Sequence, residues 1–303
     1  MRKLKVGFGK AETQYLLPIT YYLLSFILVQ GHILKKPAII FLLFTASFSL
    51  AYARDYVLDK DVFFDAAANI MSDKNKRPVT GSVKKYYSGG KLEMSGSFIE
   101  GLAQGIIKEY YTNGTTRCVK PYRDGVLDGA VKTYDENGKL ISELTYLYGL
   151  ADGKSKKFYP DGKPREEVNY IDGKKEGLRI IYAESGAIES ETPFSDDKMN
   201  GIGTKYYEDG KIMSEVSYAN DKPDGFAKLY FENGKTRAEL FYKNGILYGI
   251  AKIYDENTGS YTEFTYKDDI IIKAYSVTKE GKRKALKKKQ TEEFINNFSF
   301  NIL

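Results

Sequence analysis

The sequence has few of the residues that most enzymes use for catalysis. Its 303 residues contain no tryptophan, a single histidine and a single cysteine. The histidine, His32, lies in an apolar N-terminal stretch, and Cys118 has no second cysteine with which to form a disulfide. If that stretch is removed, the remaining chain cannot hold a histidine-based triad, a cysteine–histidine zinc site or an internal disulfide.

Motifs for nucleotide binding or acid–base chemistry are also weak. Residues 149–155, GLADGKS, resemble a phosphate-binding loop but are one residue short of the required spacing. Glu166 and Glu167 are adjacent, so in a strand their side chains point to opposite faces and cannot work as a pair. We therefore expect a protein that is not an enzyme and that holds no cofactor or metal ion.

A period of 24 residues dominates the rest of the chain. Its clearest marker is a glycine that recurs eight times without a gap. These repeat glycines are Gly81, Gly105, Gly129, Gly153, Gly177, Gly201, Gly225 and Gly249. They divide residues 81–272 into eight repeats.

Two columns of aromatic residues follow the same period. The first column is Tyr86, Tyr110, Tyr134, Phe158, Tyr182, Tyr206, Tyr230 and Tyr254. The second is Phe98, Tyr122, Tyr146, Tyr170, Phe194, Tyr218, Tyr242 and Tyr266. Large rings supply apolar area that a single-layer sheet otherwise lacks, so we interpret both columns primarily as packing ladders. The first column is also a candidate surface for a protein partner.

Each repeat reads as two short β-rich runs separated by Asn-Gly or Asp-Gly pairs, such as Asn233-Gly234. Such a pair is typical of a two-residue type I′ hairpin loop. A longer second loop, for example 243–249, is expected to lead into the next hairpin. The sequence thus predicts an all-β fold, an elongated single-layer antiparallel meander of about eight 24-residue β-hairpin repeats.

This register places a lysine opposite a glutamate in four repeats. The expected pairs are Lys132 with Glu143, Lys156 with Glu167, Lys228 with Glu239, and Lys252 with Glu263. An exposed cross-strand ion pair contributes less than about 1 kcal/mol, and we favour this structural interpretation over a binding or acid–base ladder.

The repeats resemble the MORN repeat superfamily, and most closely the variant repeats of bacterial YwqK-type antitoxin proteins. The residues that carry the resemblance include 206–221, YYEDGKIMSEVSYAND, and 229–249, LYFENGKTRAELFYKNGILYG. The resemblance covers about residues 78–272 and implies a β-hairpin array that serves as a binding or membrane-apposed scaffold. The repeat at 177–200 departs most, with Ile180, Ala183, Ala187 and Pro193, so the sheet is expected to bend or to hold a partner there.

The N-terminal region, residues 1–53, reads as a leader. Lys35 and Lys36 precede the apolar run 37–50 and then Ala51-Tyr52-Ala53, the order of a secretory signal, with cleavage expected between Ala53 and Arg54. Residues 13–30 form a second apolar segment. Either translation starts near Ile33, or 13–30 and 37–53 form a membrane hairpin of apolar helices that anchors the repeats.

The remaining segments flank the array. Residues 54–80 break the period and are expected to cap it with a short helix or loop and a strand before Gly81. Residues 261–266 and 270–276 should supply the last strands, and the tail, 273–303, is basic. Its six candidate contacts to anionic lipid or an acidic partner are Lys282, Arg283, Lys284, Lys287, Lys288 and Lys289.

Charge outside the two ends excludes one class of partner. Residues 1–53 and 273–303 each carry a net charge of +5, which leaves residues 54–272 at about −4. The sheet therefore has no basic footprint for nucleic acid. We expect an exported, non-catalytic scaffold in the periplasm or cell envelope that binds an unknown protein, including a toxin as the family label suggests. The alternative is a membrane-associated structural protein of the envelope.

Overall fold

The computed structural model describes residues 54–65 and 70–297, and the side chains as far as 294. The chain separates into two units, 1–53 and 54–303, and the described residues all belong to the second. The leader, its two apolar segments and the predicted helices lie outside the described residues. Among the residues that are described, no helix has the length and apolar character needed to cross a membrane.

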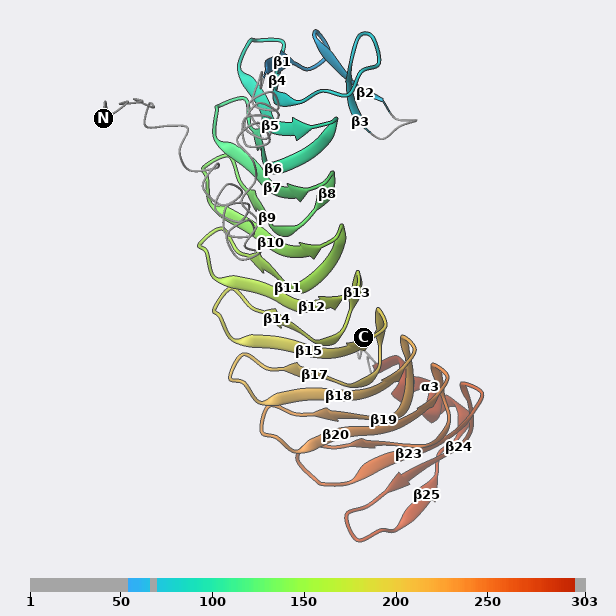
Figure 1. Ribbon diagram of the computed structural model, residues 1–303. Coiled ribbons are helices and arrows are strands. Elements are labelled where there is room, and N and C mark those ends of the chain that lie inside the picture. Colours follow the sequence, from blue (N-terminus) through green and yellow to red (C-terminus); the bar gives the residue numbers. More distant parts are fainter. Residues whose placement is uncertain (1–53, 66–69, 298–303) are drawn as a thin grey trace, which may run out of the picture. The chain divides into compact units, whose positions relative to one another are not determined.

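The repeats form one long sheet in which neighbouring strands are joined in sequence order (Figure 1). Its main strands are β4 (Gly81–Tyr86), β5 (Leu92–Ile99), β6 (Leu102–Tyr110), β7 (Thr116–Arg123), β9 (Gly129–Tyr134), β10 (Leu140–Leu147), β11 (Leu150–Phe158), β12 (Pro164–Ile171), β14 (Gly177–Tyr182), β15 (Ile188–Ser195), β17 (Gly201–Tyr206), β18 (Ile212–Ala219), β19 (Lys222–Tyr230), β20 (Thr236–Lys243), β22 (Gly249–Tyr254), β23 (Tyr261–Lys267) and β24 (Ile270–Val277). Four two-residue strands precede β9, β14, β17 and β22, namely β8 (Val126–Leu127), β13 (Lys174–Lys175), β16 (Lys198–Met199) and β21 (Ile246–Leu247).

The ends of the sheet carry additional elements. Strand β1 (Arg54–Val57) pairs in parallel with β4, so the sheet is mixed rather than wholly antiparallel. Strands β2 (Val62–Asp65) and β3 (Ile70–Asp73) form a separate hairpin, where the sequence predicts a short helix or loop. At the far end β25 (Arg283–Ala285) pairs with β24, and helix α3 (Lys288–Asn297) follows.

The loops within the hairpins differ from the prediction. The Asn233-Gly234 loop is not type I′: the Gly234 N–H donates to the Phe231 carbonyl, and the Phe231 N–H to the Lys235 carbonyl. This closes a three-residue loop in which Gly234 (φ +80) has a positive φ and Asn233 does not. A bulge between Thr236 and Ala238 then cancels the one-residue offset.

The type I′ turns are instead in the second loop. The sequence predicts this loop to be the longer of the two, but it is only two residues long. In Asn220-Asp221 both residues have positive φ, 48° and 68°, and Ala219 pairs with Lys222 across them. Equivalent turns recur at 100–101, 124–125, 148–149, 172–173, 196–197, 244–245 and 268–269. Each turn also joins successive hairpins; for example, the Asp221 N–H donates to the Met199 carbonyl.

The repeat glycines sit where the strand after each tight turn bulges. Between β18 and β19 the pairing shifts between Val216 and Tyr218, and Gly225 lies beside this shift with φ +108. All eight repeat glycines have positive φ, a conformation that other L-residues adopt only with strain.

The two faces of the sheet differ in burial. One face, here called the core face, carries Ala227, Leu229, Ala238 and Leu240, all buried. Because side chains alternate along a strand, Phe226, Lys228, Tyr230, Glu239 and Phe241 lie on the opposite face, here called the outer face.

The chain covers the core face at both ends. At the N-terminal end Val62 and Met71 of the β2–β3 hairpin pack with Val83 and Phe98. At the other end Phe294 of α3 packs against Phe264, with ring centroids 5.4 Å apart. The second aromatic column belongs to this face, since Tyr218 and Tyr242 pack against the C-terminal core cluster.

Candidate functional site

A continuous row of side chains crosses the outer face from β4 to β23. Each member pairs with the next across neighbouring strands. In order, this charge row is Lys84, Ser95, Lys108, Val119, Lys132, Glu143, Lys156, Glu167, Ile180, Glu191, Thr204, Glu215, Lys228, Glu239, Lys252 and Glu263. The four predicted Lys–Glu alignments are therefore confirmed.

Only two of the four aligned pairs form an ion pair within 4 Å. Lys132 Nζ lies 3.6 Å from Glu143 Oε1, and Lys156 Nζ lies 3.1 Å from Glu167 Oε1. These lysine side chains are about two-fifths exposed, so the pairs add little to stability. Glu263 instead contacts Arg283, and the Lys252 ammonium lies over the Tyr261 ring.

The first aromatic column lies beside this row and is tied to it by hydrogen bonds. The hydroxyl groups of Tyr206, Tyr230 and Tyr254 donate to Glu191, Glu215 and Glu239, at 2.7, 2.6 and 3.1 Å. The bond to Glu215, together with burial, raises the pKa of Tyr230 to about 12. Burial and the bond to Glu239 raise the pKa of Tyr254 to about 12.

The predicted aromatic binding surface is thus largely occupied by contacts within the chain. Tyr110 also has a hydroxyl contact, with Ser95, and the rings other than Tyr86 are half-buried. The role of this column as a partner-binding surface stays a prediction, while its role in joining repeats is visible in the structure.

A second tyrosine, which the sequence analysis missed, also joins the repeats. Tyr87, Tyr111, Tyr159 and Tyr207 each directly follow a member of the first column. Their hydroxyl groups donate to the carbonyl oxygens of Tyr110, Tyr134, Tyr182 and Tyr230, the next members of that column. The recurring aromatic-Tyr dipeptide could have revealed them.

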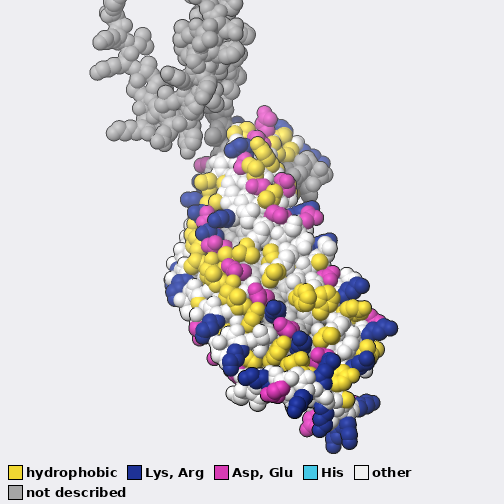
Figure 2. All heavy atoms as spheres, turned by 90° about the horizontal axis from the view of Figure 1, so that it is seen from below, with side chains coloured by type: hydrophobic (Ala, Val, Ile, Leu, Met, Phe, Trp, Pro, Cys, Tyr) yellow, Lys and Arg dark blue, Asp and Glu magenta, His cyan; other side chains and the backbone are white. Residues whose placement is uncertain are grey.

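The outer face also carries exposed apolar side chains that the sequence analysis did not identify. They lie near the tight turns or next to the repeat glycines. The set is Ile99, Ile106, Val126, Leu147, Leu150, Ile171, Leu178, Ile202, Phe226, Ile246, Ile250 and Ile270. Figure 2 shows hydrophobic side chains on the surface between Lys, Arg, Asp and Glu. Bulges interrupt the alternation of side chains along the strands, so a search for strict period-2 alternation does not find this pattern.

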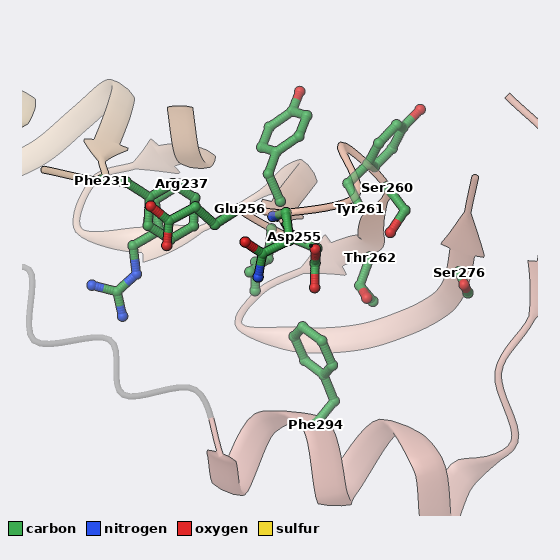
Figure 3. Close-up of a pocket in the computed structure, with 12 residues that line it drawn as sticks. Phe231, Arg237, Asp255, Glu256, Ser260, Tyr261, Thr262, Ser276 and Phe294 are labelled. Carbon is green, nitrogen blue, oxygen red and sulfur yellow. Dashed lines mark hydrogen bonds between the residues drawn. The ribbon is translucent and has the colours of Figure 1, made fainter. Parts of the chain in front are cut away.

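An open cavity of about 450 Å³ lies between α3 and the last Asn-Gly-type loop. Figure 3 shows Phe294 pointing from α3 toward the loop that carries Asp255 and Glu256, with Arg237 nearby. Asp255 Oδ1 accepts the N–H groups of Asn257 and Thr258, and these bonds lower the pKa of Asp255. The carboxylate therefore shapes the loop and is not arranged for acid–base chemistry.

A model described as the MORN repeat variant matches residues 127–148, 151–172, 199–220 and 223–244. The chain is a MORN-like repeat protein. The matches leave out the divergent repeat at 177–200, yet β14 and β15 pair along their whole length there and the MORN-like sheet continues without a break.

Other comparisons with the MORN-like chain are distant. No curated protein matches it. Solved structures that match include the crystal structures of TcdB2-TccC3-Cdc42, TcdB2-TccC3 and TcdB2-TccC3-TEV, at 12%, 11% and 12% identity and TM-scores of 0.20, 0.19 and 0.18. These matches cover 74%, 71% and 71% of this chain but span only 15%, 16% and 17% of those chains.

The basic residues predicted as contacts lie at the C-terminal end of the MORN-like sheet. Arg283 makes contacts within the fold, since its guanidinium pairs with Glu263 and lies over the Tyr275 ring. Lys282, Lys284, Lys287, Lys288 and Lys289 are all exposed, and the Lys288 ammonium lies 3.9 Å from Glu292. Their lipid or partner contact stays a prediction.

Cys118 is buried on the core face, next to Thr133. Within the described ranges, no three His, Cys, Asp or Glu side chains are grouped so that they could hold a metal ion. The predicted cleavage site is at the limit of what is described, because Ala53 lies outside it and Arg54 begins β1.

Proposed function

We propose that this MORN-like protein is an exported, non-catalytic scaffold that binds a protein partner through the outer face of its sheet. The observation that carries the proposal is the recurrence of exposed aliphatic and aromatic side chains on that face. Exposed apolar patches rimmed by polar residues mark interaction sites in soluble proteins.

The C-terminal part of the outer face is the best candidate for the partner contact. Phe226 is 67% exposed and meets Phe241 edge-on, with ring centroids 5.1 Å apart. Ile202 and Ile250 occupy the equivalent position in the flanking repeats and are also more than half exposed. A rigid aromatic pair between aliphatic neighbours is a typical anchor for a protein interface.

Site-specific photo-crosslinking in living cells tests this proposal. A photoreactive residue at Phe226 or Ile250 should give a discrete adduct with the same partner protein. The matched control is the exposed loop residue Asn137, away from this surface, which should give no such adduct. Failure of both outer-face positions to give an adduct would contradict the proposal.

The resemblance to YwqK-type antitoxins supports a toxin as the partner. An antitoxin must share a compartment with its toxin, so export restricts this version to a secreted or envelope-targeted toxin. Export itself predicts that the protein isolated from cells begins at Arg54. N-terminal sequencing that reads through residues 33–53 would reject cleavage at this site.

A membrane-associated role is a second candidate, favoured by the exposed lysines around β25 and α3. Anionic lipid attracts each such charge by about 1 kcal/mol near the surface. Sedimentation with phosphatidylserine-containing vesicles should fall when Lys282, Lys284, Lys287 and Lys289 are changed to glutamine. Equal sedimentation with neutral phosphatidylcholine vesicles would contradict lipid recognition by charge.

A further inference from the structure

The charge row has a two-fold pattern that the repeat period does not require. Lysines occupy alternate strands from β4 to β11, and glutamates occupy alternate strands from β10 to β18. The pattern reverses about a point midway between β10 and β11, where Glu143 pairs with Lys156.

We propose that the outer face binds the outer face of a second copy of this chain, about a two-fold axis parallel to the strands and midway between β10 and β11. Such an interface is isologous, so each contact occurs twice. The proposal goes beyond the partner-binding function, and its footprint, from β4 to β18, excludes Phe226 and Ile250 and shares only Ile202 with the partner site.

The charge row becomes self-complementary under this operation. Every member from β4 to β18 meets a member of matching character in the second copy. The facing pairs are Lys84 with Glu215, Ser95 with Thr204, Lys108 with Glu191, Val119 with Ile180, Lys132 with Glu167, and Glu143 with Lys156. A shift of one strand would bring lysine opposite lysine and glutamate opposite glutamate, so the charges select the register.

An apolar group, independent of the charge row, is centred on the same axis. Val126, Leu147, Leu150 and Ile171 lie on the outer face beside the tight turns, and each is exposed by 42–51%. Under the two-fold operation Leu147 faces Leu150 of the second copy, and Val126 faces Ile171. A shift of two strands would keep most of the charges matched but would break up this apolar group, because Leu150 would face Arg123 in one direction of shift and Leu147 would face Lys174 in the other.

A third row, next to the repeat glycines, agrees with the same axis. Ile106 faces Pro193 of the second copy, and Pro121 faces Leu178. The only like charges that meet are Arg123 and Lys174, at the rim. Arg123 already pairs with Asp128 at 3.0 Å, and Lys174 with Asp196, so their repulsion is reduced.

Tyr148 adds a conformational argument. It occupies the first position of a type I′ turn, with φ 48, where the other repeats have Glu, Asp or Asn. A bulky residue is strained there. Tyr148 is 71% exposed and stands between Leu147 and Leu150, at the proposed axis. Strain of this kind is typical of positions retained for binding.

The footprint is large enough for a stable dimer. Twelve strands at about 4.8 Å span roughly 55 Å, and the three rows span about five residues, or roughly 16 Å, along the strands. A stable interface needs about 800 Å² from each partner. Because each sheet twists along its length, contact is closest near the axis, where the four apolar side chains lie.

Charge exchange between two variants tests the proposal on the full chain as cells produce it. Lys108 faces Glu191 and Lys132 faces Glu167 across the interface. Lys108→Glu with Lys132→Glu makes both of these facing pairs negative, and Glu167→Lys with Glu191→Lys makes both positive. Sedimentation should show dimers for the unchanged protein, at least tenfold weaker self-association for each variant, and recovery of dimers in their equimolar mixture. The matched control, Lys228→Glu with Lys252→Glu, lies in the same row outside the footprint and should stay dimeric.

The apolar group gives a second, separate test. Leu150→Glu should dissociate the dimer, whereas Ile246→Glu, at the equivalent position of a repeat outside the footprint, should not. Circular dichroism of every variant checks that the sheet is retained. A monomeric unchanged protein, a mixture that fails to recombine although both variants are folded, or equal loss in the controls would overturn the proposal. The crosslinking positions Phe226 and Ile250 lie outside the dimer footprint. Absence of a crosslinked partner would therefore count against the proposed function, whereas the dimer would still form.

Discussion

Individual tyrosines hold this single-layer sheet together by pairing a ring with a hydrogen bond. The Tyr230 ring covers the outer face while its hydroxyl donates to Glu215 in the preceding hairpin at 2.6 Å. Such a bond opposes ionisation of the phenol. The tyrosinate has no proton to donate, and its negative charge would lie beside the carboxylate.

This bond predicts a pH dependence at the alkaline end. The pKa of Tyr230 is about 12 in the folded protein, against the ordinary value of 10.0. A raised pKa means that its contribution to the free energy of unfolding is complete below pH 10 and is lost as the pH rises from 10 toward 12. Ultraviolet titration of Glu215→Gln should show one more tyrosine ionising near its ordinary pKa than in Glu208→Gln, an exposed control. Identical titrations would contradict the assignment.

The repeat glycines give a prediction about backbone conformation. Gly201 has φ +115, and an added Cβ would lie 2.9 Å from Cγ of Pro193. Gly201→Ala should lower the free energy of unfolding by about 1–2 kcal/mol. Gly89→Ala is the control, since Gly89 has no positive φ and no atom within 4 Å of the added Cβ. Equal denaturation midpoints for the two variants would show that the bulge does not need glycine.

For individual residues, the sequence predicts which side chains lie opposite each other better than it predicts what those side chains bind. The Lys–Glu alignments follow from period and alternation, and they are confirmed. The hydroxyl bonds of Tyr87 and Tyr207 do not follow, because a tyrosine next to another aromatic residue reads as packing until the neighbouring hairpin is placed.

At the scale of the hairpin, the sequence places the tight turns in the wrong loops for a physical reason. Asn-Gly fits both a type I′ turn and a three-residue loop that ends in a left-handed glycine. In some repeats both loops contain such pairs, as Asn233-Gly234 and Asn244-Gly245 show. Only the strand pairing distinguishes them, and the compensating bulge then hides the difference.

Tyr148 is expected to destabilise its own tight turn while strengthening self-association. Tyr148→Asn removes a bulky residue from the first type I′ position, so the free energy of unfolding of the monomer should rise by about 0.5–1 kcal/mol. The same change removes an exposed ring from the proposed two-fold axis, so self-association should weaken. Denaturation at high dilution and sedimentation at high concentration measure the two effects. A change of both quantities in the same direction would contradict the proposed trade-off.

At the scale of the whole array, stability comes from contacts between neighbouring hairpins. Each hairpin contacts the next through strand pairing, a tight-turn N–H bond and, in four repeats, a tyrosine hydroxyl. The sequence predicts this arrangement because its period is unbroken. It does not predict the β2–β3 hairpin or α3 on the core face, because these segments lie outside the period.

Repeat architecture predicts tolerance of a whole-repeat deletion. Removal of residues 177–200 joins Glu176 directly to Gly201, which occupies the same point of the period as the deleted Gly177. The sheet should re-form with a modest loss of stability, as nearest-neighbour coupling requires. Removal of residues 177–188 is the control, because half a repeat reverses strand direction and turn placement. Circular dichroism showing equal loss of β structure in both deletions would contradict the modular account.

The central claim is that the outer face of the array is the surface that makes contacts. Lysine acetylation of the unchanged protein, followed by mass spectrometry over a dilution series, measures this most directly. Lys108, Lys132 and Lys156 should lose reactivity as the concentration rises, while Lys228 and Lys252 in the same row keep theirs. Reactivity of all five lysines that is independent of concentration would contradict the account.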